Sequence, residues 1–155
     1  MSNNEGTLSV AVRELPVVRV ACAAYRPGSG DENMGKEIRA LFERVQAWLQ
    51  EIGYDPYTRL TIGSIASTEE QLLRYECCIE VPDEVQSAPE GIRIKKLHGG
   101  KYAVVTIAKD PHLIPATVRR FHQEYAPQNN VQVDAARPTY EIYFEDVMEY
   151  CVPVV

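Results

Sequence analysis

A glutamate in the middle of a short aromatic segment is the residue of this chain best suited to bind a ligand or to react. The segment covers residues 137–145 and reads RPTYEIYFE. Side chains alternate between the two faces of a strand, so Glu141 would share one face with Thr139 and Tyr143. If that face is buried, the carboxylate needs a positive partner, because an unpaired charge is costly to remove from water. The partner is either a ligand or a Lys or Arg on a neighbouring strand; a Glu that faces water is the remaining alternative.

Tyrosine is the residue type in surplus, with nine in 155 residues. Its ring faces attract cations and pack against flat ligands, although each ring could equally be an ordinary strand residue. With the aromatic side chains of two predicted helices added, the candidate ligand-binding residues are Glu141, Tyr143, Tyr75, Tyr150, Tyr25, Trp48 and Phe121. For Trp48 the alternative is core packing, because it lies in the apolar stripe of its predicted helix.

Residues 30–37, GDENMGKE, fit the GxxxxGK spacing of a phosphate-binding loop. Glu37 stands where such a loop needs a Ser or Thr to hold magnesium, and Asp31 and Glu32 would repel a phosphate. We expect instead a loop whose acidic residues favour the N-terminus of the following helix.

The histidines and cysteines do not form a metal-binding or nucleophilic pattern. His98, His112 and His122 lack the spacing of metal ligands, and the four cysteines contain no CxxC pair. The sequence therefore predicts no metal, no cofactor and reduced cysteines in a cytoplasmic protein. If the chain is an enzyme, Glu141 would act as a general base and Tyr143 would polarise the substrate.

The net charge of −6 disfavours nonspecific binding to nucleic acid, and the sequence has no basic stripe. No apolar run is long enough to span a membrane. A protein partner is a further possibility, through exposed acidic residues such as Glu69, Glu70, Asp83 and Glu84. We expect a cytoplasmic protein that does not bind nucleic acid directly.

The first half of the chain has the pattern strand, helix, strand, strand. Residues 1–11 are expected to form a disordered tail, and the β-branched run at 17–25 predicts a strand. Apolar residues from Ile38 to Ile52 recur every three or four positions, which predicts a helix that ends at Gly53. Two strands follow at 60–66 and 72–81. The polar face of the second, which carries Arg74 and Glu76, is expected to meet solvent.

The second half, after an exposed connection at 82–91, repeats this plan. Residues 92–97 and 101–108 predict a hairpin that turns at Gly99 and Gly100. A helix follows, with Ile114, Val118 and Phe121 in its apolar stripe, and two strands close the chain, one of which carries Glu141.

The two halves can be superposed by residue. Phe42 falls on Phe121, residues 59–61 fall on 137–139, and Tyr75 falls on Tyr150. The sequence thus predicts one α+β domain at 12–155, built from duplicated strand-helix-strand-strand units at about 12–85 and 92–155. Antiparallel sheets of the two halves would form a cleft near a pseudo-twofold axis, with Glu141 close to that axis.

Three motifs, at residues 74–82 (RYECCIEVP), 97–104 (LHGGKYAV) and 140–143 (YEIY), resemble the GyrI-like family in order and spacing. That family includes the effector-binding domains of multidrug-sensing transcription regulators and the DNA gyrase inhibitory protein. The resemblance implies a duplicated fold with a ligand cleft, and it implies that Glu141 binds lipophilic cations with help from Tyr143, Tyr75 and Tyr150. The turn at 109–111 and the segment at 125–127 depart from the family pattern, so the ligand itself does not carry over.

Three functions follow from the residues and the resemblance together. The first is a standalone binding domain for amphipathic, cationic aromatic compounds, which serves sensing or sequestration. The second, implied by some relatives, is a hydrolase that opens cyclopropane rings of toxic natural products. The third is a protein inhibitor similar to the DNA gyrase inhibitory protein.

Overall fold

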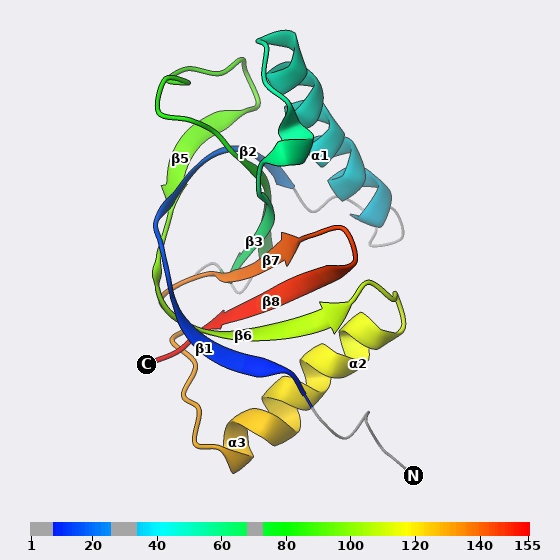
Figure 1. The fold of residues 1–155 in the computed structure, drawn as a ribbon, viewed down its shortest axis with the longest axis vertical. Helices are drawn as coiled ribbons and strands as arrows, with labels where there is room; N and C mark the ends of the chain where they lie inside the picture. Colours follow the sequence, from blue (N-terminus) through cyan, green and yellow to red (C-terminus); the bar gives the residue numbers. More distant parts are fainter. Residues whose placement is uncertain (1–7, 26–33, 68–72) are drawn as a thin grey trace.

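Eight antiparallel strands form one sheet, and two main helices cover one of its faces (Figure 1). The computed structural model describes residues 8–25, 34–67 and 73–155. The strands are β1 (Val10–Leu15), β2 (Val18–Tyr25), β3 (Thr61–Ser67), β4 (Leu73–Glu80), β5 (Arg93–Leu97), β6 (Gly100–Ala108), β7 (Thr139–Tyr143) and β8 (Val147–Pro153). The helical elements are α1 (Met34–Glu51), a 3-10 turn (Pro56–Thr58), α2 (Leu113–Arg120), a π-helical turn (Phe121–Tyr125) and α3 (Ala126–Gln128). The α+β class predicted from the sequence is confirmed.

The sheet is rolled, as its order and its short connections require. The order is β1-β6-β8-β7-β3-β4-β2-β5, so β1 is one edge of the sheet and β2 lies beside the other edge, β5, although only Pro16 and Val17 separate β1 from β2. The two ends must therefore approach each other, and Figure 1 shows β1 continuing into β2 as one arc. At the crossing, a Cβ added to Gly99 would lie 2.8 Å from the carbonyl carbon of Pro16. Only glycine allows two backbones to pass this closely.

The two faces of the sheet bury different clusters. The inner, concave face holds one hydrophobic cluster with residues from β2 to β8, among them Val20, Ile62 and Tyr140. The outer face packs against the helices, with Val45 and Leu49 of α1 over β2 and β4, and Phe121 over β6 and β8. Most of the apolar stripe predicted for α1 is thus buried or partly buried, although Ile52 at its end is 44% exposed, and Gly53 follows with a φ of 98°. The stripe predicted for the second helix is partly buried along α2 and fully buried at Phe121.

Four details differ from the sequence-based expectation. The predicted tail is shorter, because Val10 and Ala11 belong to β1, which pairs with β6; residues 1–7 lie outside the described part. Because β1 occupies the position beside β6, β5 and β6 do not form the predicted hairpin. Strand β5 pairs with β2 instead. The β4 face predicted to meet solvent lines the concave interior, where Glu76 is 5% exposed. Rolling of the sheet encloses that face.

The fourth difference concerns the duplication. The two halves meet where β3 pairs with β7, and Gly63 lies opposite Glu141. These two residues are also 78 positions apart, which is the offset of the repeat, so the pseudo-twofold axis passes between them. Along the ladders Gly63 pairs with Cys77, and Glu141 pairs with Tyr150. Tyr150 therefore corresponds to Cys77 and not to Tyr75 as predicted, because the hairpin of the second half is shorter by more residues than the superposition allowed.

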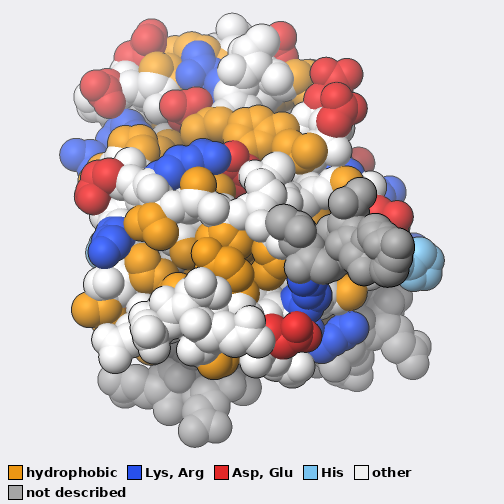
Figure 2. Space-filling model, turned by 60° about the horizontal axis from the view of Figure 1, so that its bottom comes forward, with side chains coloured by type: hydrophobic (Ala, Val, Ile, Leu, Met, Phe, Trp, Pro, Cys, Tyr) orange, Lys and Arg blue, Asp and Glu red, His pale blue; other side chains and the backbone are white. Residues whose placement is uncertain are grey.

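The surface mixes charges of both signs. On the face shown in Figure 2, hydrophobic side chains gather in the middle, and both acidic and basic side chains lie around them. Within the described residues, no helix has the length and apolarity needed to cross a membrane.

Candidate ligand-binding site

Glu141 lies near the centre of the sheet, on the face that the helices cover. In β7 the side chains of Tyr140 and Ile142 enter the concave core, so alternation directs Glu141 and Tyr143 to the helix side. Glu141 is half-buried there, between Gly63 of β3 and Tyr150 of β8. The predicted sharing of faces along this strand is confirmed.

Two tyrosine hydroxyls converge on one oxygen of this carboxylate. Tyr143 donates a hydrogen bond of 2.6 Å to Glu141 Oε1, and Tyr75 donates one of 2.8 Å to the same atom. The two hydroxyl oxygens lie 3.2 Å apart. No described residue donates to Oε2, and none of the ion pairs among the described residues includes Glu141. The carboxylate is thus oriented by neutral donors, and its second oxygen has no hydrogen-bond partner among the described residues.

Burial and the nearby negative charge keep the surrounding phenols protonated. Burial, followed by the charge of Glu141, raises the pKa of Tyr75 and of Tyr143 well above the ordinary value for tyrosine. The same two causes raise the pKa of Tyr150 to about 12. At neutral pH these phenol groups are therefore neutral hydrogen-bond donors.

Gly63 provides the space for this arrangement. A Cβ at this position would overlap the hydroxyl of Tyr75 and would lie 2.6 Å from its Cζ atom and 3.3 Å from Glu141 Oε1. The glycine is therefore required by the close approach of Tyr75. Sequence reasoning missed it, because its contact partners lie far away along the chain.

Residues from both halves surround the cluster. The ring of Phe42 on α1 meets the ring of Tyr143 edge to face, with 6.1 Å between centroids. Tyr25 and Tyr75 belong to one buried cluster, against which other α1 side chains pack. On the other side, the hydroxyl of Tyr150 lies 2.7 Å from His122 Nε2, in the π-helical turn after α2. Neither Phe42 nor His122 was predicted from the sequence as a residue of this site, because helical periodicity places a residue on a stripe but does not reveal its cross-sheet neighbours.

Two of the predicted site residues lie elsewhere. Trp48 packs against the cluster between α1 and β2, and it lines a separate hollow beside residues 84–89. Phe121 is fully buried in the cluster that includes Tyr150, and it stacks against Tyr125; none of its ring contacts or hydrogen bonds among the described residues is to Glu141. Glu141 does not line any of four hollows found among the described residues, and the cleft between the halves stays a prediction. No group of three or more His, Cys, Asp or Glu in the described ranges could hold a metal ion.

Comparison with known proteins identifies the fold. Residues 9–155 match the protein family described as "GyrI-like small molecule binding domain". The chain belongs to this family. No curated protein sequence matches this GyrI-like domain.

Several solved structures share the fold of this GyrI-like domain at low sequence identity. The C-terminal domain of EcmrR is 13% identical, with a TM-score of 0.68 over 96% of this chain and 98% of that chain. SAV2435 bound to tetraphenylphosphonium is 15% identical, with a TM-score of 0.65 over 95% and 94% of the two chains. A hydrolase from Listeria innocua is 14% identical, with a TM-score of 0.63 over 94% and 91%.

The contact between His122 and Tyr150 predicts a pH dependence of stability in this GyrI-like domain. Burial lowers the pKa of His122, so below the ordinary histidine value of about 6.5 the unfolded chain binds more protons than the folded one. The free energy of unfolding should therefore fall as the pH drops below about 6.5. In His122→Gln this part of the decline should be absent when urea midpoints are measured between about pH 7.5 and 5.5.

His112→Gln is the matched control, because His112 is exposed like His122, but its side chain makes no capping hydrogen bond at the start of α2, whereas His122 contacts the Tyr150 hydroxyl. It should keep the decline of the unsubstituted protein. An equal decline in His122→Gln would show that His122 does not contribute to it.

Proposed function

We propose that this domain binds small amphipathic cations with aromatic groups at the Glu141 cluster, which consists of Glu141, Tyr75, Tyr143 and Tyr150, and that it serves to sense or sequester them. One observation carries the proposal: a half-buried carboxylate held by two phenol hydroxyls, with no cationic partner among the described residues. A partly desolvated carboxylate is most stable beside a positive charge, and a bound cation would supply it.

The aromatic surroundings favour a flat or lipophilic cation over a small hydrated one. The rings of Tyr75, Tyr143 and Phe42 lie around or beside the carboxylate, and aromatic faces attract cations by about 0.5–2 kcal/mol each. Because the phenols stay neutral, they do not compete with Glu141 for the positive charge. The ligand in the solved structure of SAV2435, tetraphenylphosphonium, has this chemistry and supports the proposal.

Glu141→Gln tests the role of the charge. The amide keeps the shape of the side chain and an oxygen that accepts both phenol hydrogen bonds, so the fold should be retained. We expect affinity for tetraphenylphosphonium to fall about 10- to 100-fold, which corresponds to about 1.4–2.8 kcal/mol of lost attraction. Isothermal titration calorimetry measures this difference directly; Trp48 fluorescence is a poor reporter, since this ring packs in another cluster.

Two controls separate charge from shape. Glu145→Gln removes the same charge from an exposed position just beyond β7 and should leave the affinity unchanged. Triphenylphosphine oxide is a neutral probe with similar rings, and its binding should not respond to Glu141→Gln. Equal affinity of Glu141→Gln and the unsubstituted protein for tetraphenylphosphonium would overturn the proposed function.

Hydrolysis is the second candidate function, and the unoccupied hydrogen-bonding capacity of Glu141 Oε2 favours it. That oxygen could accept a proton from water while a phenol polarises the substrate. Formation of more than one equivalent of product per protein, lost in Glu141→Gln, would distinguish an enzyme from a binding domain.

A further inference from the structure

The concave face of the sheet, opposite the face that carries Glu141, contains a hollow. Its volume is about 460 Å³, within the range of small-molecule sites. Ser64 of β3 and Glu76 of β4 pair across the sheet and both line this hollow. Their sequence neighbours Gly63 and Tyr75 lie on the helix side, so the sheet itself separates the hollow from the Glu141 cluster.

Positive charge dominates the lining of this hollow. Its cationic residues are Arg74, Lys95, Lys96 and Arg137, and its acidic residues are Glu76 and Asp134. Both acidic side chains already have partners: Lys95 Nζ lies 2.7 Å from Glu76 Oε1, and Arg137 Nε lies 2.9 Å from Asp134 Oδ2. Arg74 and Lys96 have no acidic partner among the described residues. In a chain of net charge −6, a hollow with surplus positive charge favours an anionic ligand.

The pair of Glu76 and Lys95 places a donor at the wall of the hollow. The Glu76 side chain is 7% exposed, whereas the Lys95 side chain is 30% exposed. A buried pair of this kind contributes little net stability, because both charges must be desolvated. The pair does hold the ammonium group of Lys95 in place, and the N–H groups of Lys95 that are not bonded to Glu76 can donate to a ligand. Arg74 lies on the same face, two positions before Glu76, at an exposed point of the strand.

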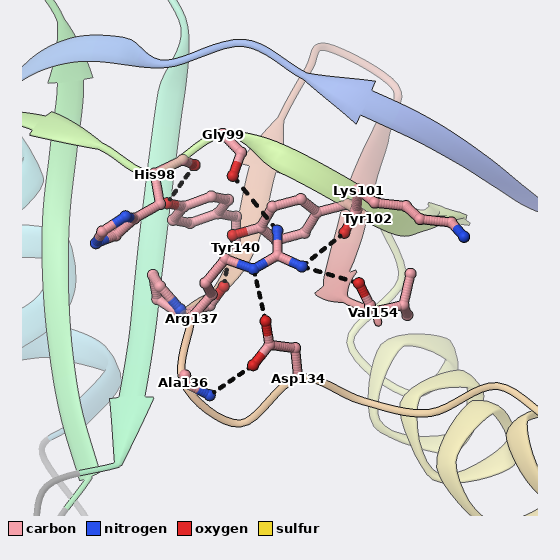
Figure 3. Close-up of polar contacts among 10 residues, drawn as sticks. His98, Gly99, Lys101, Tyr102, Asp134, Ala136, Arg137, Tyr140 and Val154 are labelled. Atoms are coloured by element: carbon pink, nitrogen blue, oxygen red, sulfur yellow. Dashed lines mark hydrogen bonds and ion pairs between the residues drawn. The ribbon is translucent and has the colours of Figure 1, made fainter.

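A network of hydrogen bonds holds the opposite wall of the hollow (Figure 3). The guanidinium of Arg137 donates to the carbonyl oxygens of Val154 at 2.8 Å and Lys101 at 3.2 Å, in addition to Asp134. The Tyr140 hydroxyl donates to the carbonyl oxygen of His98 at 2.9 Å. In the figure the His98 ring extends away from Arg137 toward the neighbouring strands. Residues 134–139 and the turn after β5 thus form a fixed wall, and a preformed site costs little to order on binding.

From these observations we propose that the concave hollow binds a small molecule that carries an oxyanion, either a carboxylate or a phosphate, through Lys95 and Arg74. This site is distinct from the one assigned to cations. The domain would then hold ligands of opposite charge on opposite faces of one sheet.

The experiment uses three probes with the same ring: benzoate, phenyl phosphate and the neutral benzamide. Amide chemical shifts of the full-length protein are followed while each probe is added. Saturable changes at Ser64, Glu76, Lys95 and His98 with an anionic probe, and none with benzamide, support the proposal. The ratio of affinities for benzoate and phenyl phosphate identifies which oxyanion the site prefers. Absence of saturable change with both anions, or equal binding of benzamide, overturns it.

Substitutions then assign the binding residues. Arg74→Gln should lower the affinity for the preferred anion about tenfold, and Arg74→Lys should restore most of it. In the double variant Glu76→Gln with Lys95→Gln, two neutral amides can still bond to each other, so the fold is kept while the anion affinity is lost. Arg119→Gln, an equal charge change on the exposed side of α2, should have no effect. Unchanged affinity in both Arg74→Gln and the double variant would overturn the assignment.

Binding at the two faces can be told apart. Glu141→Gln should leave the affinity for the anionic probe unchanged, and Arg74→Gln should leave tetraphenylphosphonium binding unchanged. If tetraphenylphosphonium does not bind at Glu141, the evidence for the anion site is therefore unaffected. If the anionic probes do not bind in the hollow, the evidence for the cation site is likewise unaffected.

Discussion

Gly63→Ala is expected to lower the free energy of unfolding by about 1–3 kcal/mol and to weaken cation binding at the same time. The added methyl group would overlap the hydroxyl of Tyr75 and would lie 2.6 Å from its Cζ atom. Tyr75 is 5% exposed and packed beneath α1, so its ring has little room to move. Any movement that relieves the overlap also lengthens the hydrogen bond to Glu141. Urea unfolding measures the first effect, and titration with tetraphenylphosphonium measures the second.

Gly35→Ala is the control for Gly63→Ala. A Cβ at Gly35, in the first turn of α1, would meet nothing within 4 Å. This substitution should be neutral or stabilise the protein by about 0.5–1 kcal/mol, because alanine favours a helix. Adding Tyr75→Phe to Gly63→Ala removes the overlapping oxygen, so the double variant should lose less than the sum of the single losses. Strict additivity of the two losses would contradict the proposed contact.

The pairing of Gly63 with Glu141 also explains why the site contains one carboxylate although the fold is duplicated. The two residues are equivalent in the repeat and lie opposite each other on β3 and β7. A glutamate at both positions would place like charges directly across the sheet, which is destabilising. Glycine in the first half removes that repulsion and opens the space that Tyr75 fills from β4. The asymmetry of the site thus follows from its position at the symmetry axis.

Local patterns were sufficient to predict the central features of the molecule. Alternation along 139–143 correctly placed Glu141 and Tyr143 on one face and Tyr140 on the other. Periodicity correctly predicted the burial of Leu49 in α1 and of Phe121 in the π-helical turn after α2, although Ile52, at the end of the first predicted stripe, is exposed. These properties depend on spacings of two to four residues, which a single sequence displays directly.

Features set by distant contacts were missed or predicted wrongly. Strand β1 is mostly exposed to solvent, and it is a strand because β6 pairs with it; residue 10 lies opposite residue 105. The same pairing replaces the hairpin expected at 92–108. The burial of Glu76 depends on the rolling of the sheet, and the role of His122 depends on Tyr150, which lies across the sheet. No local pattern in the sequence encodes any of these contacts.

The largest loss of stability is expected for Arg137→Met, at about 2–4 kcal/mol. The guanidinium joins three segments that are distant in sequence: it donates to the carbonyl oxygens of Gly99, Lys101 and Val154, and it lies 5.0 Å from the centre of the Tyr102 ring. Its hydrogen bond also holds the pKa of Asp134 below the usual value. Methionine retains the packing of the aliphatic stem but removes the guanidinium donors from these carbonyl groups, of which that of Lys101 keeps a second donor, the backbone N–H of Val154. Urea unfolding at neutral pH measures the loss.

Arg137→Lys and Arg39→Met test the cause of this loss. One ammonium group cannot reproduce the planar fork that reaches several acceptors, so lysine should recover only part of the stability. Arg39 is exposed on α1, and its replacement by methionine should change the stability by less than about 0.5 kcal/mol. Because Arg137 fixes residues 134–138, which form one wall of the concave hollow, Arg137→Met should also weaken binding of the anionic probe there. A loss of stability no larger than that of Arg39→Met would mean that the segments are held together without this side chain.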